Sequence, residues 1–247
     1  LLDIYVTNYV EYSLNNNPWC GDRRKNLRDY CMPDWFPGIK DYLFHNQGNW
    51  VFKDVSTSSG IAHYKGKGLG VIPADFDQDG DLDIFLVSYY SDGNNDSRLL
   101  ENTNNGNIID VTAATGINQN LNHEIDLPSG FYFGDRLSAS WGDFNNDGYP
   151  DLFLGNSVQS ELYKNNGDGS FTNITESAGF QVSCEDCYIA GALWLDYDLD
   201  GFLDIFLSDY HSYSINKLYR NLGNETFELI DLTQVILNKN SFSAIFM

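Results

Sequence analysis

The sequence predicts an all-β protein built from a repeated unit of four short antiparallel strands, and three observations lead to this prediction. First, a nine-residue acidic pattern, D-x-[DN]-x-D-G-x-x-D, occurs three times, beginning at Asp75, Asp143 and Asp196. Second, each copy runs directly into a β-branched and aromatic segment such as residues 84–87, which favours an extended strand. Third, a strand, a glycine turn and a second strand follow each copy.

The elements are expected in a fixed order along the chain. Residues 1–6 match the last residues of the acidic pattern and its strand, with the acidic half absent. Strand, turn and strand blocks begin at Asp41, Arg98, Glu161 and Lys217. Three of these blocks close at Gly60, Gly116 and Gly179, and apolar strands at 138–142 and 190–194 then lead into the next acidic loop. Each unit therefore places its acidic loop between its first and second strands.

A repeat of about 50 residues with insertions is the size of a propeller blade. We expect one β-propeller segment of about four blades, with a partial first blade that carries an insertion bracketed by cysteines. The expected divisions are 1–62, 63–117, 118–180 and 181–238, with the start of a further blade at 239–247. Since both ends fall inside a blade, we expect the chain to be a segment of a larger propeller, in preference to a four-bladed ring closed by joining the two termini.

The acidic pattern has the spacing of a calcium loop. Calcium takes six to eight oxygen ligands, which alternate side chains of a tight loop can supply while glycine permits the bend. We assign the side chains at positions one, three, five and nine, and the backbone carbonyl at position seven, as ligands of about three ions. The assigned residues are Asp75, Asp77, Asp79, Asp81 and Asp83; Asp143, Asn145, Asp147, Tyr149 and Asp151; and Asp196, Asp198, Asp200, Phe202 and Asp204. Since Asn145 removes one charge, we expect the second site to bind more weakly.

Two other interpretations of the pattern are weaker. An EF-hand requires a glutamate at position twelve and flanking helices, whereas Leu86, Leu154 and Leu207 stand there and strands follow. Asp, Asn and Gly also make ordinary surface turns, but that explanation does not account for three copies in one register.

On these loops and blocks, the sequence resembles the FG-GAP or VCBS repeats of integrin α-chain propellers. Within that family it is most similar to the cartilage-acidic-protein-like group with ASPIC/UnbV-type tails. The resemblance implies a calcium-binding β-propeller that is extracellular or on the cell surface. It also implies a role in adhesion or ligand recognition, although one scaffold hosts many functions.

Composition limits the partners. The chain has 35 acidic and 14 basic residues, a formal charge of −21, 15% aromatic residues and 22 glycines. Such an acidic excess disfavours nucleic-acid binding. The sequence contains no run of about 18 apolar residues, so we expect no membrane span in this segment. No signal peptide is visible.

Four cysteines occur as two local pairs, and this arrangement favours disulfides in a secreted or cell-surface protein, extracellular or periplasmic. Cys20 and Cys31 bracket a loop that lacks an apolar pattern. Cys184 and Cys187 form a C-x-x-C, for which a redox motif, half of a zinc site and a loop staple are open, the staple being favoured. Triplets at Asn95, Asn173 and Asn224 are candidate glycosylation acceptors.

Two insertions are candidates for recognition, because loops decorate the faces of a propeller. The first, residues 8–39, offers possible ligand contacts at Trp19, Arg23, Arg24, Arg28 and Trp35. The alternative is a disulfide-pinned cap with its charges in water. The second, residues 118–137, holds His123, Glu124, Asp126, Tyr132 and Arg136. We favour a solvated loop there over acid-base chemistry or metal binding.

We read no catalytic constellation in the sequence, so the first hypothesis is a non-catalytic, calcium-stabilised module that binds a protein or glycan on the propeller face. The alternative is a carbohydrate-active enzyme or lectin on the same scaffold, since aromatic residues are available; paired carboxylates outside the loops would be its mark. A structural spacer in a larger assembly is the third hypothesis.

Overall fold

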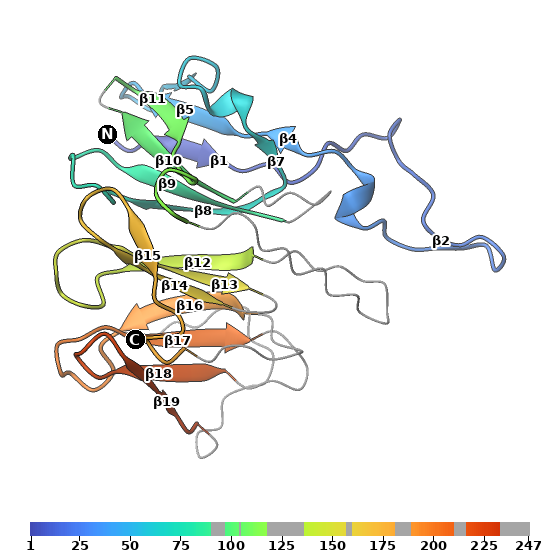
Figure 1. The fold of residues 1–247 in the computed structure, drawn as a ribbon. Coiled ribbons are helices and arrows are strands. Elements are labelled where there is room, and N and C mark those ends of the chain that lie inside the picture. Colours follow the sequence, from blue (N-terminus) through green and yellow to red (C-terminus); the bar gives the residue numbers. More distant parts are fainter. Residues whose placement is uncertain are drawn as a thin grey trace.

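A computed structural model describes residues 1–89, 97–103, 105–117, 136–156, 160–180, 189–209 and 216–232. Its strands form four successive sheets that follow one another from the N-terminus to the C-terminal part of the chain (Figure 1). All pairings within these sheets are antiparallel. The predictions of an all-β fold and of a four-stranded antiparallel unit are therefore confirmed.

Three of the sheets have four strands, and neighbours in the sheet are neighbours in the chain. The second sheet consists of β8 (Gly68–Ala74), β9 (Asp83–Ser88), β10 (Arg98–Thr103) and β11 (Asn107–Asp110). The third consists of β12 (Arg136–Gly142), β13 (Asp151–Asn156), β14 (Glu161–Asn165) and β15 (Phe171–Asn173). The fourth consists of β16 (Ile189–Leu195), β17 (Asp204–Asp209), β18 (Lys217–Asn221) and β19 (Phe227–Ile230).

The first sheet has three strands, β1 (Ile4–Val6), β5 (Tyr42–Asn46) and β6 (Phe52–Asp54), in the order β1-β5-β6. Strand β1 pairs with β5 as β9 pairs with β10. It therefore takes the place of a second strand, as the match of residues 1–6 to the end of the acidic pattern predicts.

Alternating side chains of the second strands fill two cores, because successive residues of a strand point to opposite faces. Leu152 and Leu154 of β13 pack in the core shared with the second sheet. Phe153, between them, packs in the core shared with the fourth sheet. All three side chains are fully buried. The strand is therefore apolar on both faces, which explains why its sequence is a continuous apolar run.

The first strands of neighbouring sheets approach each other closely. A Cβ atom added at Gly142 would lie 2.6 Å from the Trp194 ring, so only glycine permits this approach. The indole N–H of Trp194 donates to the Ser140 carbonyl at 3.4 Å, and that of Trp141 donates to the Ile72 carbonyl at 3.3 Å. These contacts fix the relative positions of successive sheets.

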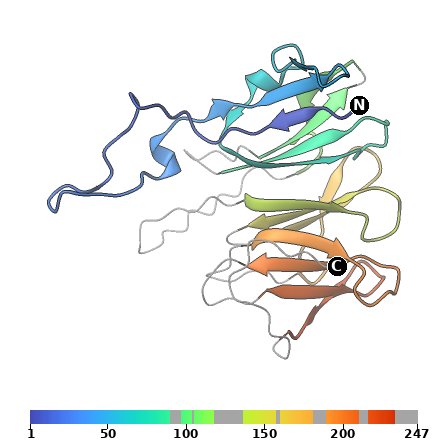
Figure 2. The same cartoon turned by 180° about the vertical axis from the view of Figure 1, so that it is seen from behind.

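The insertion at residues 8–39, called the disulfide arm below, projects away from the stack of sheets in both views (Figures 1 and 2). It contains β2 (Gly21–Asp22), β3 (Leu27–Arg28) and the 3-10 turn η1 (Pro33–Trp35). Near its base lie β4 (Ile39–Lys40), β7 (Lys65–Gly66) and η2 (Ile61–His63). In the part of the chain that the structure describes, no helix has the length and apolarity to cross a membrane.

Several predicted features lie outside the described residues. They are Cys184 and Cys187, the sequon at Asn95, residues 118–135 of the second insertion, and the expected start of a further blade at 239–247.

Candidate metal-binding loops

The three acidic loops lie along one edge of the stack, and the disulfide arm projects at the other (Figure 1). Each loop joins the first and second strands of its sheet: residues 75–83 follow β8, residues 143–151 follow β12 and residues 196–204 follow β16. This is the place that the sequence predicts for them.

The aspartate at position nine holds each loop to its sheet. In the third sheet Asp151 is fully buried, and its Oδ2 accepts a hydrogen bond from the Phe144 N–H at 3.1 Å. Its Oδ1 accepts from the Asn165 N–H at 2.8 Å. The same two bonds recur at Asp83, from Phe76 and Asn102, and at Asp204, from Tyr197 and Asn221. In the first sheet, Asp3 accepts from the Asn46 N–H at 2.8 Å. Residue Asp3 is thus the ninth-position equivalent in that sheet.

The aspartate at position one closes each loop onto its glycine. Oδ2 of Asp75 accepts from the Gly80 N–H at 3.1 Å, and the same bond joins Asp143 to Gly148 and Asp196 to Gly201. These glycines have φ of +96°, +93° and +92°, a region that only glycine adopts at low cost. The glycine of the pattern is therefore required by the bend.

Carboxylate oxygens converge in two of the loops. Among the described residues, three-membered groups with ligand atoms within 4.8 Å of one another are formed by Asp75, Asp77 and Asp83, and by Asp196, Asp198 and Asp204. In the second loop Asn145 stands at position three, and its Nδ2 donates to Asp147 Oδ2 at 2.8 Å.

The aspartates at position five also stabilise the turn of the loop. Asp79 and Asp200 accept hydrogen bonds from the backbone N–H at position seven at 2.9 and 3.0 Å. Oδ1 of Asp75 is buried without a hydrogen-bond partner in the described part of the chain. A buried, ionised oxygen without a donor is costly. The convergent, all-oxygen donor set and this unpartnered atom fit a hard cation such as calcium.

The loops concentrate negative charge in the fold. Burial raises the pKa of Asp83 to about 7, with further contributions from Asp77 and Asp79. Burial likewise raises the pKa of Asp151 to about 7, and neighbouring Asp147 and Asp143 add to it. In both cases the backbone N–H donors oppose the shift. A bound cation would favour the ionised form that burial disfavours.

These pKa shifts predict a pH dependence in a chelating buffer. The folded pKa of about 7 exceeds the unfolded value of about 3.9, so folded protein holds protons that unfolded protein has released. This stabilisation is complete below pH of about 4 and is lost as pH rises towards 7. We expect a lower urea midpoint at pH of about 7.5 than at about 5. The opposite order in chelator would contradict the prediction.

Neighbouring loops are connected directly. The Gln78 side chain, at position four of the first loop, donates to the Gly148 carbonyl of the second loop at 2.6 Å. Asn146, at the same position, donates to the Gly201 carbonyl of the third loop at 2.9 Å. Leu199 takes this position in the third loop and is 86% exposed. The three loops thus form a connected row along the edge of the stack.

Sequence reasoning missed a second set of residues that supports this row. The Asn165 side chain donates to the Phe76 carbonyl in the first loop at 2.8 Å and to the Pro150 carbonyl at 3.2 Å. Asn221 donates in the same way to the Phe144 carbonyl in the second loop at 2.7 Å. The constant asparagine at the end of each third strand was a visible signal for this role.

Replacing Asn165 by alanine is expected to lower the free energy of unfolding by about 1–3 kcal/mol, because buried carbonyls lose their donors. Asn166→Ala is the matched control, since Asn166 is exposed and its side chain bonds to the hydroxyls of Ser170 and Thr172 rather than to buried carbonyls. Its effect is expected within about 0.5 kcal/mol. Equal losses in urea denaturation would contradict the assigned role.

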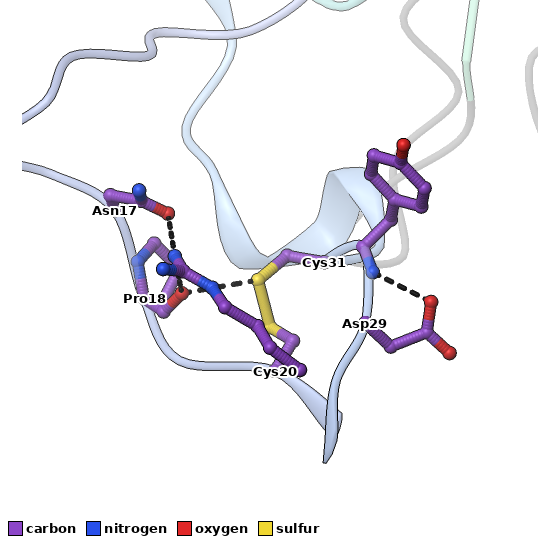
Figure 3. Close-up of a disulfide and its surroundings, with 7 residues drawn as sticks. Asn17, Pro18, Cys20, Asp29 and Cys31 are labelled. Carbon is purple, nitrogen blue, oxygen red and sulfur yellow. Dashed lines mark hydrogen bonds between the residues drawn. A yellow bond between two sulfur atoms is a disulfide. The ribbon is translucent and has the colours of Figure 1, made fainter. Parts of the chain in front are cut away.

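The disulfide expected between Cys20 and Cys31 is present and closes the disulfide arm (Figure 3). Beside it, the Arg28 guanidinium donates to the Asn17 side-chain oxygen at 2.6 Å and to the Pro18 carbonyl at 3.4 Å. At the base, the buried Lys67 ammonium lies 3.8 Å from Asp34 of the arm. Arg28 therefore serves the internal structure of the arm.

The other predicted ligand contacts are spread over the same arm. The Arg23 guanidinium lies 5.3 Å from the centroid of the Trp19 ring. The Arg24 side chain is 95% exposed and lies 3.7 Å from Asp22. Trp35, on η1, is 62% exposed. Exposed cations and aromatic rings thus gather on one projecting element.

A sheet of four antiparallel strands with an acidic loop after its first strand is the unit of a repeat protein, and comparison identifies the repeat. Residues 143–207 match the family model described as an FG-GAP-like repeat. The chain is also similar to Cartilage acidic protein 1. It is 28% identical over 178 residues to the mouse protein, covering 68% of this chain and 25% of the relative. It is 27% identical over 205 residues to the Xenopus tropicalis protein, covering 78% and 29%. The predicted resemblance is confirmed.

The chain spans about a quarter of the length of these relatives. Among solved structures, an Agrocybe aegerita lectin, described as specific for non-reducing terminal N-acetylglucosamine, is similar with a TM-score of 0.47. Its identity is 17%, over 81% of this chain and 50% of that chain. This likeness is too weak to carry a functional conclusion.

Proposed function

We propose that the chain is part of a calcium-binding β-propeller repeat module, secreted or on the cell surface, that recognises a partner without catalysis. The observation that carries the proposal is the convergence of carboxylate oxygens in the first and third loops. In the first loop, Asp75 Oδ1 is also buried without a donor among the described residues. Calcium would supply the positive charge that these oxygens lack. The disulfide agrees with an oxidising compartment.

The proposed ligands are the residues at positions one, three, five, seven and nine of each loop, about three ions in all. The first loop offers four carboxylates in Asp75, Asp77, Asp79 and Asp83. Three divalent ions would offset about six of the 21 excess negative charges. The metal is thus structural in the proposal, fixing the edge at which neighbouring sheets meet.

The exposure of the residue at position two of each loop supports a propeller that continues past the fourth sheet. Phe76 and Phe144 hold this position in the first two loops and are 2% and 0% exposed beneath the following sheet. Tyr197 holds it in the third loop and is 41% exposed. In a propeller a further sheet would cover this ring. We retain the division into units at 1–62, 63–117, 118–180, 181–238 and 239–247.

In this proposal the disulfide arm recognises the partner, and the basic turn at its tip binds an acidic ligand. The β2–β3 turn presents Arg23, Arg24 and Lys25 to solvent on a chain that is otherwise strongly acidic. A rigid base and exposed guanidinium groups suit sulfated or carboxylated glycans and acidic protein surfaces. The exposed sequon at Asn173 lies in β15 and that at Asn224 lies in the β18–β19 turn, both apart from the arm.

Heparin, as a sulfated polysaccharide probe, tests this assignment. The variant Arg24→Ser/Lys25→Ser is expected to elute from a heparin column at clearly lower salt than the parent chain. Each lost contact between a cation and a sulfate group weakens an attraction that salt screens. Lys53→Ser/Lys65→Ser is the matched control, because it removes the same charge from two exposed positions outside the arm. Equal effects of both variants, or no retention of the parent chain, would count against the arm.

A further inference from the structure

The basic side chain of Arg220, on β18, contacts the third acidic loop. The Arg220 Nε is 2.6 Å from Asp198 Oδ2 in the third loop, an ion-pair distance without hydrogen-bond alignment. Its Nη2 donates to Asp200 Oδ2 at 3.3 Å. Strand β18 supplies Arg220 from the position just before Asn221, whose N–H holds Asp204. The guanidinium therefore contacts two of the four carboxylates assigned to one metal site.

The equivalent positions of the other sheets carry different chemistry. His45, Glu101 and Lys164 each precede the constant asparagine, as Arg220 does. In the third sheet the Lys164 ammonium pairs with Glu225, which belongs to the β18–β19 turn. In the second sheet Glu101 adds a carboxylate near Asp77 and Asp79. The third-strand residue thus differs in charge from loop to loop.

We propose that Arg220 is a built-in counter-cation of the third loop, which competes with a divalent cation for Asp198 and Asp200. This proposal rests on the proposed calcium function. An arginine side chain is always charged, so it holds both carboxylates at every physiological pH. A divalent ion at the same site would be repelled by the guanidinium and would have to take two carboxylates from it.

The proposal predicts a ranking of the sites by charge. The third loop has four assigned carboxylates and one guanidinium, which gives it the net charge of the second loop, where Asn145 replaces a carboxylate. Lys164 lies near Asp147 and Asp151 of the second loop, but its charge is balanced by Glu225. The first loop keeps all four carboxylates and has Glu101 beside it. The first loop is therefore expected to bind calcium most tightly, while the third keeps its shape when calcium is scarce.

Calcium titration calorimetry on the full chain tests the proposal with three variants. Asp196→Asn identifies the binding step of the third loop, because that step is lost. Arg220→Gln is expected to strengthen this same step about tenfold, since a unit positive charge near the ion is removed. Lys164→Gln, the matched change on the third sheet, is expected to alter it less than about twofold, because Lys164 pairs with Glu225. A step that Arg220→Gln weakens or leaves unchanged would overturn the proposal.

A second measurement in chelator separates this proposal from the calcium function. Arg220→Gln and Asp198→Asn are each expected to lower the urea midpoint alone, and the double variant is expected to lose less than the sum. Additive losses would overturn the counter-cation role, whatever the calcium titration shows. Absence of calcium binding in every variant would instead overturn the proposed function, while non-additive losses in chelator would still support Arg220.

Discussion

The variant Asp151→Ala is expected to lose about 3 kcal/mol or more of unfolding free energy in calcium. Asp151 is fully buried, and its two oxygens accept from the backbone N–H groups of Phe144 and Asn165. Alanine leaves both donors unsatisfied, each at a cost of about 1–3 kcal/mol. It also removes one proposed ligand of the second ion, so the loss is expected to be larger in calcium than in chelator.

Urea denaturation with calcium and with chelator measures both parts of this effect. Asp151→Asn serves as the isosteric control, because it keeps one acceptor oxygen and removes the charge. Its unfolding free energy is expected to lie between that of the parent chain and that of Asp151→Ala. A loss below about 1 kcal/mol for alanine would show that the ninth position does not hold the loop.

Phe180→Ala is expected to cost about 3–5 kcal/mol, with calcium or without it. The Phe180 ring lies at the centre of the core between the third and fourth sheets. Its centroid is 4.6 Å from that of Tyr219 and 4.7 Å from that of Phe227. Removing this ring opens a cavity among rings that the backbone of two sheets holds in place.

Leu199→Ala is the control for this core variant, because Leu199 is exposed at a loop tip. Its effect is expected within about 0.5 kcal/mol. If the loss of unfolding free energy for Phe180→Ala depended strongly on calcium, the core and the metal loops would not contribute independently to stability, which would contradict this prediction.

The sequence predicted the features that repeat within each unit. The acidic pattern located the loops between first and second strands, since one register written three times fixes both the turn and the following strand. Residues 1–6 gave the place of β1, because Asp3 keeps the ninth-position bond to Asn46. The local pair Cys20 and Cys31 gave the disulfide.

Contacts between units were not predictable in the same way. The bonds from Gln78 to Gly148 and from Asn146 to Gly201 join residues far apart in sequence, and they exist only once the sheets are stacked. The pairing of Arg220 with Asp198 depends on the register between β17 and β18, which places a third-strand side chain over the loop. The sequence shows which residues can make such contacts, but it does not show which residues pair with one another.

The central claim, that the acidic loops are structural calcium sites, is tested most directly by thermal unfolding of the chain in calcium and in chelator, with calorimetric counting of bound ions. The account predicts a large rise in midpoint with calcium and about three ions bound per chain. An unchanged midpoint with no bound calcium would contradict it.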